Sequence, residues 1–323
     1  MRLGIVSTAK INLLVLAGAR ASTEVDVVAV GSRDSATAEA YAREHGIPRA
    51  HGSYDALLAD PDVDAVYISL PNSLHHEWTL RSLAAGKHVL CEKPYSRRPA
   101  EAEEAFDAAD AAGLHLMEAF MWRHNPQTRR LVELLPEIGE LRAIRATFAF
   151  RLDDETNVRM LPELDGGALM DVGCYCVSGA RLLAGAEPER VSAEQVMSRT
   201  GVDIQLAGVL RFPGDVTAEL TAAMAFDHQG LEAIGSDGTI VVPDPWHCHS
   251  GVLVVNGTEV RVEPEDSYRL ELENLAAAIR GEADLLLGRA DALGQARTIE
   301  ALYRSAAEGR AISPLSTSSA PKP

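Results

Sequence analysis

The sequence predicts a two-domain α/β protein, in which a doubly wound parallel sheet is followed by an α+β domain with an open-faced, mostly antiparallel sheet. The chain has 323 residues, which is long for a single hydrophobic core. Residues 2–119 alternate continuous apolar runs with alanine-rich helical segments, as buried parallel strands and their crossover helices do. From residue 141 onward, short segments alternate apolar and polar side chains, which is typical of antiparallel strands with one solvated face.

Composition narrows the class of protein. The chain is 46% hydrophobic and 24% charged, as globular proteins are, and apolar runs such as Val25–Val30 are too short to span a bilayer. Four cysteines in a chain of this size indicate reduced thiols, and the N-terminus does not resemble a signal peptide. We therefore expect a cytoplasmic protein with no membrane partner. The net charge of −17 repels a phosphate backbone and argues against nucleic acid.

The first domain is expected to hold five strands and four helices. The strands are Leu3–Val6, Val25–Val30, Ala65–Leu70, His88–Cys91 and Leu114–Met117, and the helices are Ile11–Arg20, Ser35–His45, Leu74–Ala85 and Ala100–Ala112. In a doubly wound sheet the ligand lies at the carboxyl ends of the strands.

The first strand-to-helix turn is a candidate pyrophosphate site. A dinucleotide fingerprint has glycines where this chain has Ser7, Ala9 and Asn12. The small side chains of Ser7, Thr8 and Ala9 still allow backbone N–H groups near Lys10 and Ile11 to approach a phosphate. The alternative is a plain tight turn.

The end of the second strand bears on the choice of cofactor. Ser32 and Arg33 stand where an acidic residue would bind a ribose 2′-hydroxyl, and a guanidinium matches a 2′-phosphate. We therefore expect NADP, with NAD possible. The alternative leaves Arg33 in solvent and Asp34 on the ribose.

Two further strand ends are expected to border the nicotinamide half of the cofactor. The first is Leu70-Pro71-Asn72-Ser73-Leu74-His75, where Asn72 or Ser73 can cap the next helix and His75 fits a packing role in its first turn. The second is Glu92-Lys93-Pro94, where proline stops the strand. Lys93 is then either a working residue or a solvated strand cap.

The connector after residue 119 carries aromatic and cationic side chains. Trp122 and Arg123 lie in Phe120-Met-Trp-Arg-His-Asn-Pro126, where an aromatic-lined pocket or a hydrophobic plug between domains can form.

The second domain is expected to be strand-rich. Its strands are Leu141–Leu152, Arg190–Ser198, Ile204–Phe212, Val216–Ala223, Gly230–Gly235, Thr239–Val242 and Val252–Val262, and helices near Tyr268–Arg280 and Ala290–Glu308 close it. One face of the sheet stays uncovered, which favours self-association. We place the domains at residues 1–122 and 123–315, with a disordered Ser/Pro tail at 316–323.

Residues 166–184 predict one helix opened by Gly166 and Gly167. Asp171 and Tyr175 are four apart and so share a helical face. A phenol of pKa roughly 10 beside a carboxylate can act as a general acid/base if an ammonium lies near it. The alternative is an ordinary contact on a buried helix. His247-Cys248-His249 is a poor metal motif because adjacent side chains diverge, so no metal is expected.

Taken together, Glu92-Lys93-Pro94 and Gly167 through Tyr175 resemble the glucose–fructose oxidoreductase / inositol dehydrogenase / rhizopine-catabolism (Gfo/Idh/MocA) family, in particular its D-xylose dehydrogenase and dimeric dihydrodiol dehydrogenase branch. Further landmarks are Pro71 to His75, Gly86 to Cys91 and Glu118 to Arg123. The resemblance implies a Rossmann domain, and a second domain whose open sheet forms a homodimer or homotetramer.

The resemblance also assigns roles. Lys93, Tyr175 and Asp171 match the catalytic lysine, the acid/base tyrosine and the aspartate that orients substrate, and Glu92 and Asn72 match positions near the nicotinamide. The expected cofactor-binding residues are Ser7, Thr8, Ala9, Lys10, Ile11, Ser32, Arg33, Leu70, Pro71, Asn72, His75, Glu92, Lys93, Trp122 and Arg123; the expected substrate-binding residues are Lys93, Trp122, Arg123, Asn157, Asp171 and Tyr175. Asp165 replaces a glycine of related sequences, and we expect it to alter the substrate pocket.

The favoured hypothesis is an NADP-dependent sugar or polyol dehydrogenase. The same residues would serve a ketoreductase of free or nucleotide-linked keto-sugars, or of dicarbonyls. A regulator that senses NADP(H) without turnover would not need the proton donor, and a scaffold would leave Lys93 and Tyr175 unexplained.

Overall fold

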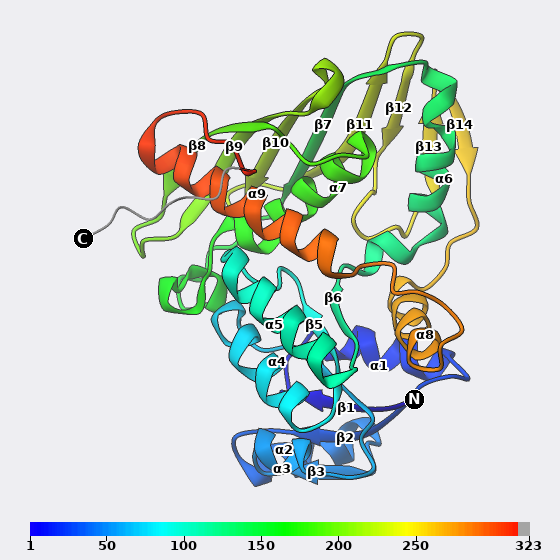
Figure 1. Cartoon of the computed structure of the whole chain (residues 1–323), viewed down its shortest axis with the longest axis vertical. Helices are drawn as coiled ribbons and strands as arrows, with labels where there is room; N and C mark the ends of the chain where they lie inside the picture. Colours follow the sequence, from blue (N-terminus) through cyan, green and yellow to red (C-terminus); the bar gives the residue numbers. More distant parts are fainter. Residues whose placement is uncertain (316–323) are drawn as a thin grey trace. The chain divides into compact units, whose positions relative to one another are not determined.

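The computed structural model describes residues 1–315, which form two compact units (Figure 1). The first unit comprises Met1–Ser96, Ala100–Asn125 and Glu265–Leu293, and the second Arg97–Pro99, Pro126–Pro264 and the chain from Gly294 onward. The tail expected at residues 316–323 lies outside the described residues.

The first unit is built on a parallel sheet, as predicted. In the described chain it has six strands in the order β3-β2-β1-β4-β5-β6. Their bounds are β1 Arg2–Val6, β2 Asp26–Gly31, β3 Arg49–His51, β4 Ala65–Ile68, β5 His88–Glu92 and β6 Leu116–Ala119. Every residue of β4 and β6 is buried, which explains why β4 is continuously apolar. Strand β6 carries one charged side chain, Glu118, whose Oε1 accepts the Tyr95 N–H at 2.8 Å. This strand order is that of a dinucleotide-binding sheet, whose crevice lies beyond the carboxyl ends of the strands.

Helices connect these strands close to the expected positions. Their bounds are α1 Asn12–Ala21, α2 Ser35–His45, α3 Tyr54–Leu58, α4 His75–Ala84 and α5 Pro99–Ala112. The strand β3 and the helix α3 were not predicted, because three and five residues are too few for a periodic pattern.

Helix α8 (Ser267–Ile279) lies in the first unit, although the sequence pattern placed it in the second domain. It packs against α1 (Figure 1). Gly18 allows the approach, since a Cβ there would lie 2.7 Å from the Arg269 backbone nitrogen. The chain thus returns to its first unit after the second sheet is complete, which local periodicity does not reveal.

The second unit contains an open, mostly antiparallel sheet, which confirms the predicted fold class. Among the described residues it has eight strands in the order β14-β13-β12-β11-β7-β10-β9-β8, and only β7 and β10 pair in parallel. The bounds are β7 Leu141–Ala149, β8 Arg190–Met197, β9 Asp203–Arg211, β10 Thr217–Ala223, β11 His228–Gly235, β12 Thr239–Val242, β13 Val252–Val255 and β14 Thr258–Arg261. The predicted single strand Val252–Val262 is therefore wrong: it is a hairpin that turns at Asn256 and Gly257, both with positive φ.

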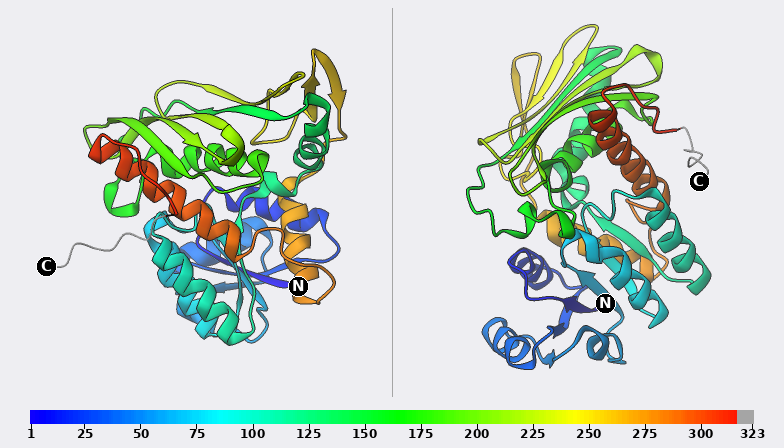
Figure 2. Two further views of the ribbon diagram at one scale, coloured as in Figure 1. Left: turned by 45° about the horizontal axis from the view of Figure 1, so that its top comes forward. Right: turned by 90° about the vertical axis from the view of Figure 1, so that its left-hand side faces the viewer.

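One face of this sheet is covered by helices (Figure 2). Helix α7 (Cys174–Ala184) packs on β7 and β10. Helix α9 (Arg289–Glu308) runs beside β8 and β9, where Leu302 approaches Gly208 and the Ser305 hydroxyl accepts the Ala193 N–H. Helix α6 (Pro126–Leu134) packs on β13. Alternate strand residues such as Leu210 and Ala218 are buried on this side.

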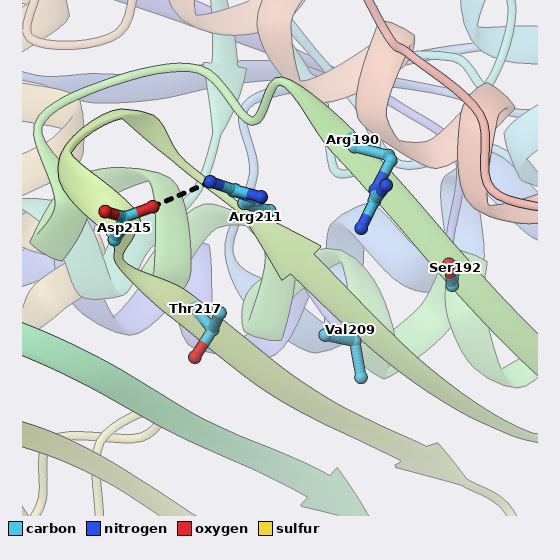
Figure 3. A pocket seen from close by; sticks show the side chains of 6 residues that line it. All are labelled: Arg190, Ser192, Val209, Arg211, Asp215 and Thr217. Atoms are coloured by element: carbon cyan, nitrogen blue, oxygen red, sulfur yellow. Dashed lines mark hydrogen bonds and ion pairs between the residues drawn. The ribbon is translucent and has the colours of Figure 1, made fainter.

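No element within residues 1–315 covers the opposite face, which carries a shallow cavity of about 290 Å³ over β8, β9 and β10 (Figure 3). It is lined by Arg190, Ser192, Val209, Arg211, Asp215 and Thr217. Arg211 pairs with Asp215 at 2.6 Å, and Val209 is 48% exposed. The cavity lies on the face away from α7, and hence away from Tyr175.

Three further properties concern the described chain. No helix within residues 1–315 has the length and apolar character needed to cross a membrane. In the same residues no three histidine, cysteine or acidic side chains are grouped to hold a metal ion. All four cysteines are buried, and they form no disulfide.

Candidate active site

The turn after β1 has the backbone shape of a glycine turn although it contains none. Ser7 has φ +124°, a conformation that side chains other than glycine rarely adopt. Hydrogen bonds hold it there: its Oγ lies 2.8 Å from Ser69 Oγ and accepts the Ala9 N–H, while Asn12 Nδ2 donates to the Ser7 carbonyl at 3.0 Å. Ser69 in turn donates to Asn12 Oδ1 at 2.6 Å. These polar contacts replace the glycine fingerprint, and Ser69 was not predicted.

The same turn leaves backbone donors available for an anion. Within residues 1–315 the N–H groups of Thr8, Lys10 and Ile11 have no acceptor. They precede helix α1, whose N-terminus carries partial positive charge. The residues present therefore fit a pyrophosphate group at this position.

At the end of β2, Asp34 is engaged in a helix cap, whereas Arg33 is exposed. Asp34 caps α2, and its Oδ1 accepts the Thr37 N–H at 2.8 Å and the Thr37 hydroxyl at 2.6 Å. These hydrogen bonds lower the pKa of Asp34. Ser32 is buried, and its N–H donates to the His51 carbonyl. Arg33 is exposed, and its positive charge opposes the rise that burial causes in the pKa of Tyr54.

His75 joins the two segments expected at the nicotinamide end. It is fully buried, with Nδ1 3.0 Å from the Pro94 carbonyl and Nε2 2.9 Å from the Leu70 carbonyl. It therefore fixes the chain after β4 against the chain after β5, which is the packing role predicted for it. Pro71 precedes the short helix η1 (Asn72–Leu74), where Asn72 is partly buried.

Glu92 is the last residue of β5, and Lys93 follows it. Tyr67 in β4 donates its hydroxyl to Glu92 Oε1, and the Lys93 N–H donates to Glu92 Oε2 at 3.2 Å. Burial and the Glu92 charge raise the pKa of Tyr67 well above its ordinary value, so this phenol stays a donor. The side chain of Lys93 is half-buried. Tyr67 was missed, since one tyrosine in an apolar strand carries no special signal.

Trp122 and Arg123 lie in the short helix η2 (Met121–His124) of the first unit. Trp122 is 1% exposed, so most of its ring is part of the core. The Arg123 guanidinium forms an ion pair with Asp291, with a distance of 3.4 Å from nitrogen to carboxylate oxygen, and lies 5.8 Å from the centre of the Trp122 ring.

The sequence predicted that Asp171 and Tyr175 lie on one α-helix, and this prediction is wrong. Leu169–Gly173 is a π-helical turn (η6), in which the Cys174 N–H donates to the Leu169 carbonyl, and α7 follows. Gly173 permits the close packing, because a Cβ there would lie 2.9 Å from Ala222 Cβ. Such turns are common at functional sites.

Asp171 is held by an arginine that the sequence did not single out. Arg159 Nε donates to Asp171 Oδ2 at 2.7 Å. Asn157, expected to bind substrate, accepts the Arg159 N–H on its side chain and caps the short helix η4 (Val158–Met160). Asn157 thus positions Arg159, which in turn binds Asp171.

Tyr175 stands among aromatic rings of the second unit. It is 8% exposed, with its ring edge-on to Phe148 at 5.3 Å and 6.0 Å from Trp246. Phe148 also meets the ring of His247 at 5.5 Å.

Asp165 was expected to alter the substrate pocket. The structure shows it 5% exposed and bound by Arg97 at 3.0 Å and Arg98 at 2.7 Å. Its φ of +53° explains why glycine also fits this position.

A parallel sheet in this strand order, with an anion-binding turn after its first strand, defines the first unit as a dinucleotide-binding domain. A family model described as "Oxidoreductase family, NAD-binding Rossmann fold" matches residues 1–120, and the model "GFO/IDH/MocA C-terminal domain" matches residues 128–241. The chain belongs to the Gfo/Idh/MocA family of oxidoreductases, which confirms the resemblance seen in the sequence.

Individual relatives span nearly the whole chain. D-xylose 1-dehydrogenase (NADP(+)) 2 of Haloferax volcanii is 39% identical over 97% of this chain and 99% of its own length. Trans-1,2-dihydrobenzene-1,2-diol dehydrogenase of Oryctolagus cuniculus is 37% identical over 78% of each chain. A crystal structure of a 3-ketoreductase from Actinomadura kijaniata with NADP and TDP-benzene superposes with a TM-score of 0.89, at 31% identity over 94% of this chain and 97% of that one.

Proposed function

We propose that this protein is an NADP-dependent dehydrogenase that acts on a sugar or polyol. The observation that carries the proposal is its similarity, over 97% of the chain, to an NADP-dependent D-xylose dehydrogenase. The turn at Ser7 supports the cofactor, because its unpaired amides within the described chain suit a pyrophosphate. Arg33 supports NADP, because Asp34 is engaged in capping α2 and a guanidinium suits a 2′-phosphate.

In the proposed reaction, Tyr175 accepts the proton of the substrate hydroxyl during oxidation and returns it during reduction. Lys93 lowers the pKa of this phenol by its positive charge and hydrogen-bonds the substrate hydroxyl. Asp171, fixed by Arg159, orients the substrate. The bound nicotinamide supplies the hydride chemistry. The other predicted cofactor-binding residues hold the cofactor at the carboxyl ends of the strands, and His75 does so indirectly, by fixing the segments that follow β4 and β5.

A second candidate is a ketoreductase of a nucleotide-linked sugar. The 3-ketoreductase structure with TDP-benzene favours it, as does 37% identity over 87% of this chain to dTDP-3,4-didehydro-2,6-dideoxy-alpha-D-glucose 3-reductase of Streptomyces violaceoruber. The same residues would work in the reducing direction.

Assays with oxidised cofactor (NADP) and with reduced cofactor (NADPH) distinguish these two functions. NADP with a panel of aldoses, polyols and trans-dihydrodiols is predicted to give reduced cofactor, followed by absorbance. Turnover only of keto-sugars with NADPH would favour the ketoreductase. Tight NADPH binding without turnover of either panel would contradict both and identify a sensor.

Self-association through the uncovered face of the second sheet is also part of the proposal. This face carries Val209 and the cross-strand charges of Arg145 with Glu219 and Glu232, each pair at 3.3 Å. A homodimer or homotetramer is expected by analytical ultracentrifugation, and Val209→Asp should shift it toward monomer. A wild type that sediments as a monomer would refute this. A cytoplasmic location is proposed from the four thiols that form no disulfide.

A further inference from the structure

Two buried aspartates lie next to the glycine pair that opens the Asp171 and Tyr175 segment: Asp165 precedes the pair in sequence, and Asp203 approaches Gly167 in space. Asp203, the first residue of β9, is 2% exposed, and Asp165 is 5% exposed. Buried carboxylates are costly unless hydrogen bonds and opposite charges compensate them. Each of these two has such partners within the second unit.

Asp203 caps the π-helical turn from a neighbouring strand. Its Oδ2 accepts the N–H of Leu169, the first residue of that turn, at 2.8 Å. Amides at the start of a helix otherwise lack acceptors, and a negative charge is favoured there. The carbonyl of the same Leu169 accepts the Cys174 N–H that defines the π turn. Asp203 thus holds the residue from which the turn carrying Asp171 is built.

Tyr303 of α9 fixes the other oxygen of this carboxylate. Its hydroxyl donates to Asp203 Oδ1 at 2.9 Å. The Arg97 guanidinium lies 5.5 Å from the centre of the Tyr303 ring and also pairs with Asp165. The contacts therefore run without interruption from Asp165 through Arg97 and Tyr303 to Asp203. Burial raises the pKa of Asp203 to about 6, so near neutral pH it is the carboxylate that accepts both hydrogen bonds.

The backbone at Gly167 is shaped around this carboxylate. Gly167 has φ +124°, and a Cβ there would lie 2.1 Å from Asp203 Oδ1. Its carbonyl accepts the Asp171 N–H at 3.0 Å. The glycine therefore lets Asp203 reach Leu169 while its own carbonyl holds Asp171.

We propose that Asp203 and Tyr303 are positioning residues for the reaction, because Asp203, which is itself held by Tyr303, binds Leu169 and so sets the placement of Asp171 and Tyr175. This inference rests on the proposed function, in which those two residues meet the substrate. Neither positioning residue touches the reacting atoms in this account. Their effect is transmitted through the π-helical turn, where a displacement of about 1 Å can cost on the order of a hundredfold in rate.

The experiment compares the full-length variants Asp203→Ala, Asp203→Asn and Tyr303→Phe with wild type. Asp203→Ala removes both acceptors, and kcat per cofactor-binding site is predicted to fall about tenfold or more. The dissociation constant for NADPH should stay within about twofold, since the pyrophosphate turn is in the first unit. Asp203→Asn keeps an acceptor for Leu169 and should recover most of kcat, whereas Tyr303→Phe should lose part of it.

The pH profile of kcat provides a readout that simple loss of stability would not move. In Asp203→Ala the Tyr175 phenol lies at different distances from its charged neighbours. The apparent pKa of the limb of the pH profile that Tyr175 produces should therefore shift. Asp215→Ala serves as the control, because Asp215 is exposed and its pairing with Arg211 is on the uncovered face.

The possible outcomes separate a failure of the positioning role from a failure of the proposed function on which it rests. Wild-type kcat and pH profile in both Asp203→Ala and Tyr303→Phe, with only a lower melting temperature, would overturn the positioning role. If Asp203→Ala does not fold, Tyr303→Phe decides by the same criterion. If Tyr175→Phe itself retains full turnover, the proposed function fails instead.

Discussion

The buried phenol of Tyr67 donates its hydrogen bond to the carboxylate of Glu92 on the adjacent strand, directly before Lys93. The contact ties a core residue of β4 to the last residue of β5, immediately before the candidate catalytic lysine. Burial raises the pKa of Glu271 in α8 well above its ordinary value, and the nearby charge of Glu92 adds to this rise. The candidate site in the first unit therefore rests on a packed polar cluster.

Replacing Tyr67 by phenylalanine should destabilise the protein. Glu92 loses a buried donor to one oxygen, and hydrogen bonds to charged groups contribute about 1.5–3 kcal/mol. Urea unfolding should show a loss of this size in the free energy of unfolding. Equal midpoints for the two proteins would mean that the contact carries no stability.

The variant Arg33→Asp should reverse the cofactor preference. The guanidinium favours a 2′-phosphate, whereas an introduced carboxylate repels it, so the NADP/NAD ratio of kcat/KM should fall by about tenfold or more. Arg43→Asp makes the same charge change in the last turn of α2, on a side chain that is 72% exposed, and should leave the ratio unchanged. The same ratio in wild type and Arg33→Asp would refute the role of Arg33.

Gly167 tests the backbone before the π-helical turn, and Gly86, a glycine of the first unit with positive φ, is its control. Gly86→Ala, at φ +74° with nothing within 4 Å, should cost about 1 kcal/mol of backbone strain. Gly167→Ala, at φ +124°, adds a collision with Asp203 Oδ1 at 2.1 Å and should cost roughly 3 kcal/mol or more. Chemical denaturation measures both. Equal losses would show that Asp203 moves aside without cost.

Stability should depend on pH through Asp203. Burial raises its pKa from 3.8 to about 6, so ionisation is harder in the folded protein than in the unfolded chain. Its contribution is therefore full below pH 3.8 and is lost as pH rises through about 6, by roughly 3 kcal/mol in total. The difference in unfolding free energy between wild type and Asp203→Asn, measured from pH 4 to 7.5, should follow this course. A difference independent of pH would contradict it.

The sequence predicted much of the fold because most of its helices and strands have a clear pattern of apolar residues. Helix α2 was predicted at its observed bounds, and the strands around Ile5 and Val66 were identified by their continuous apolar runs. The hairpin of β13 and β14 was missed although Asn256-Gly257 is a typical hairpin turn. The place of α8 could not be predicted, because it depends on a close approach to Gly18 from about 250 residues away.

The candidate site shows the same division. Lys93, Asp171 and Tyr175 were selected from local motifs and from family resemblance. Their supporting residues were not, because the contacts of Tyr67 with Glu92, Arg159 with Asp171 and Asp203 with Leu169 join segments far apart in sequence or in a loop without periodicity. Each supporting residue is also common in ordinary strands and loops. Only the three-dimensional structure distinguishes them.

The most direct test of the central claim is the turnover of Tyr175→Phe with NADP and the sugar that wild type oxidises best, measured beside NADPH binding. Loss of the general acid/base predicts a kcat about 10²–10⁴-fold lower, with NADPH affinity within about twofold of wild type. Tyr95→Phe, which removes a buried hydroxyl in the first unit, controls for the loss of a phenol elsewhere. A Tyr175→Phe variant that turns over the sugar at the wild-type rate would contradict the account.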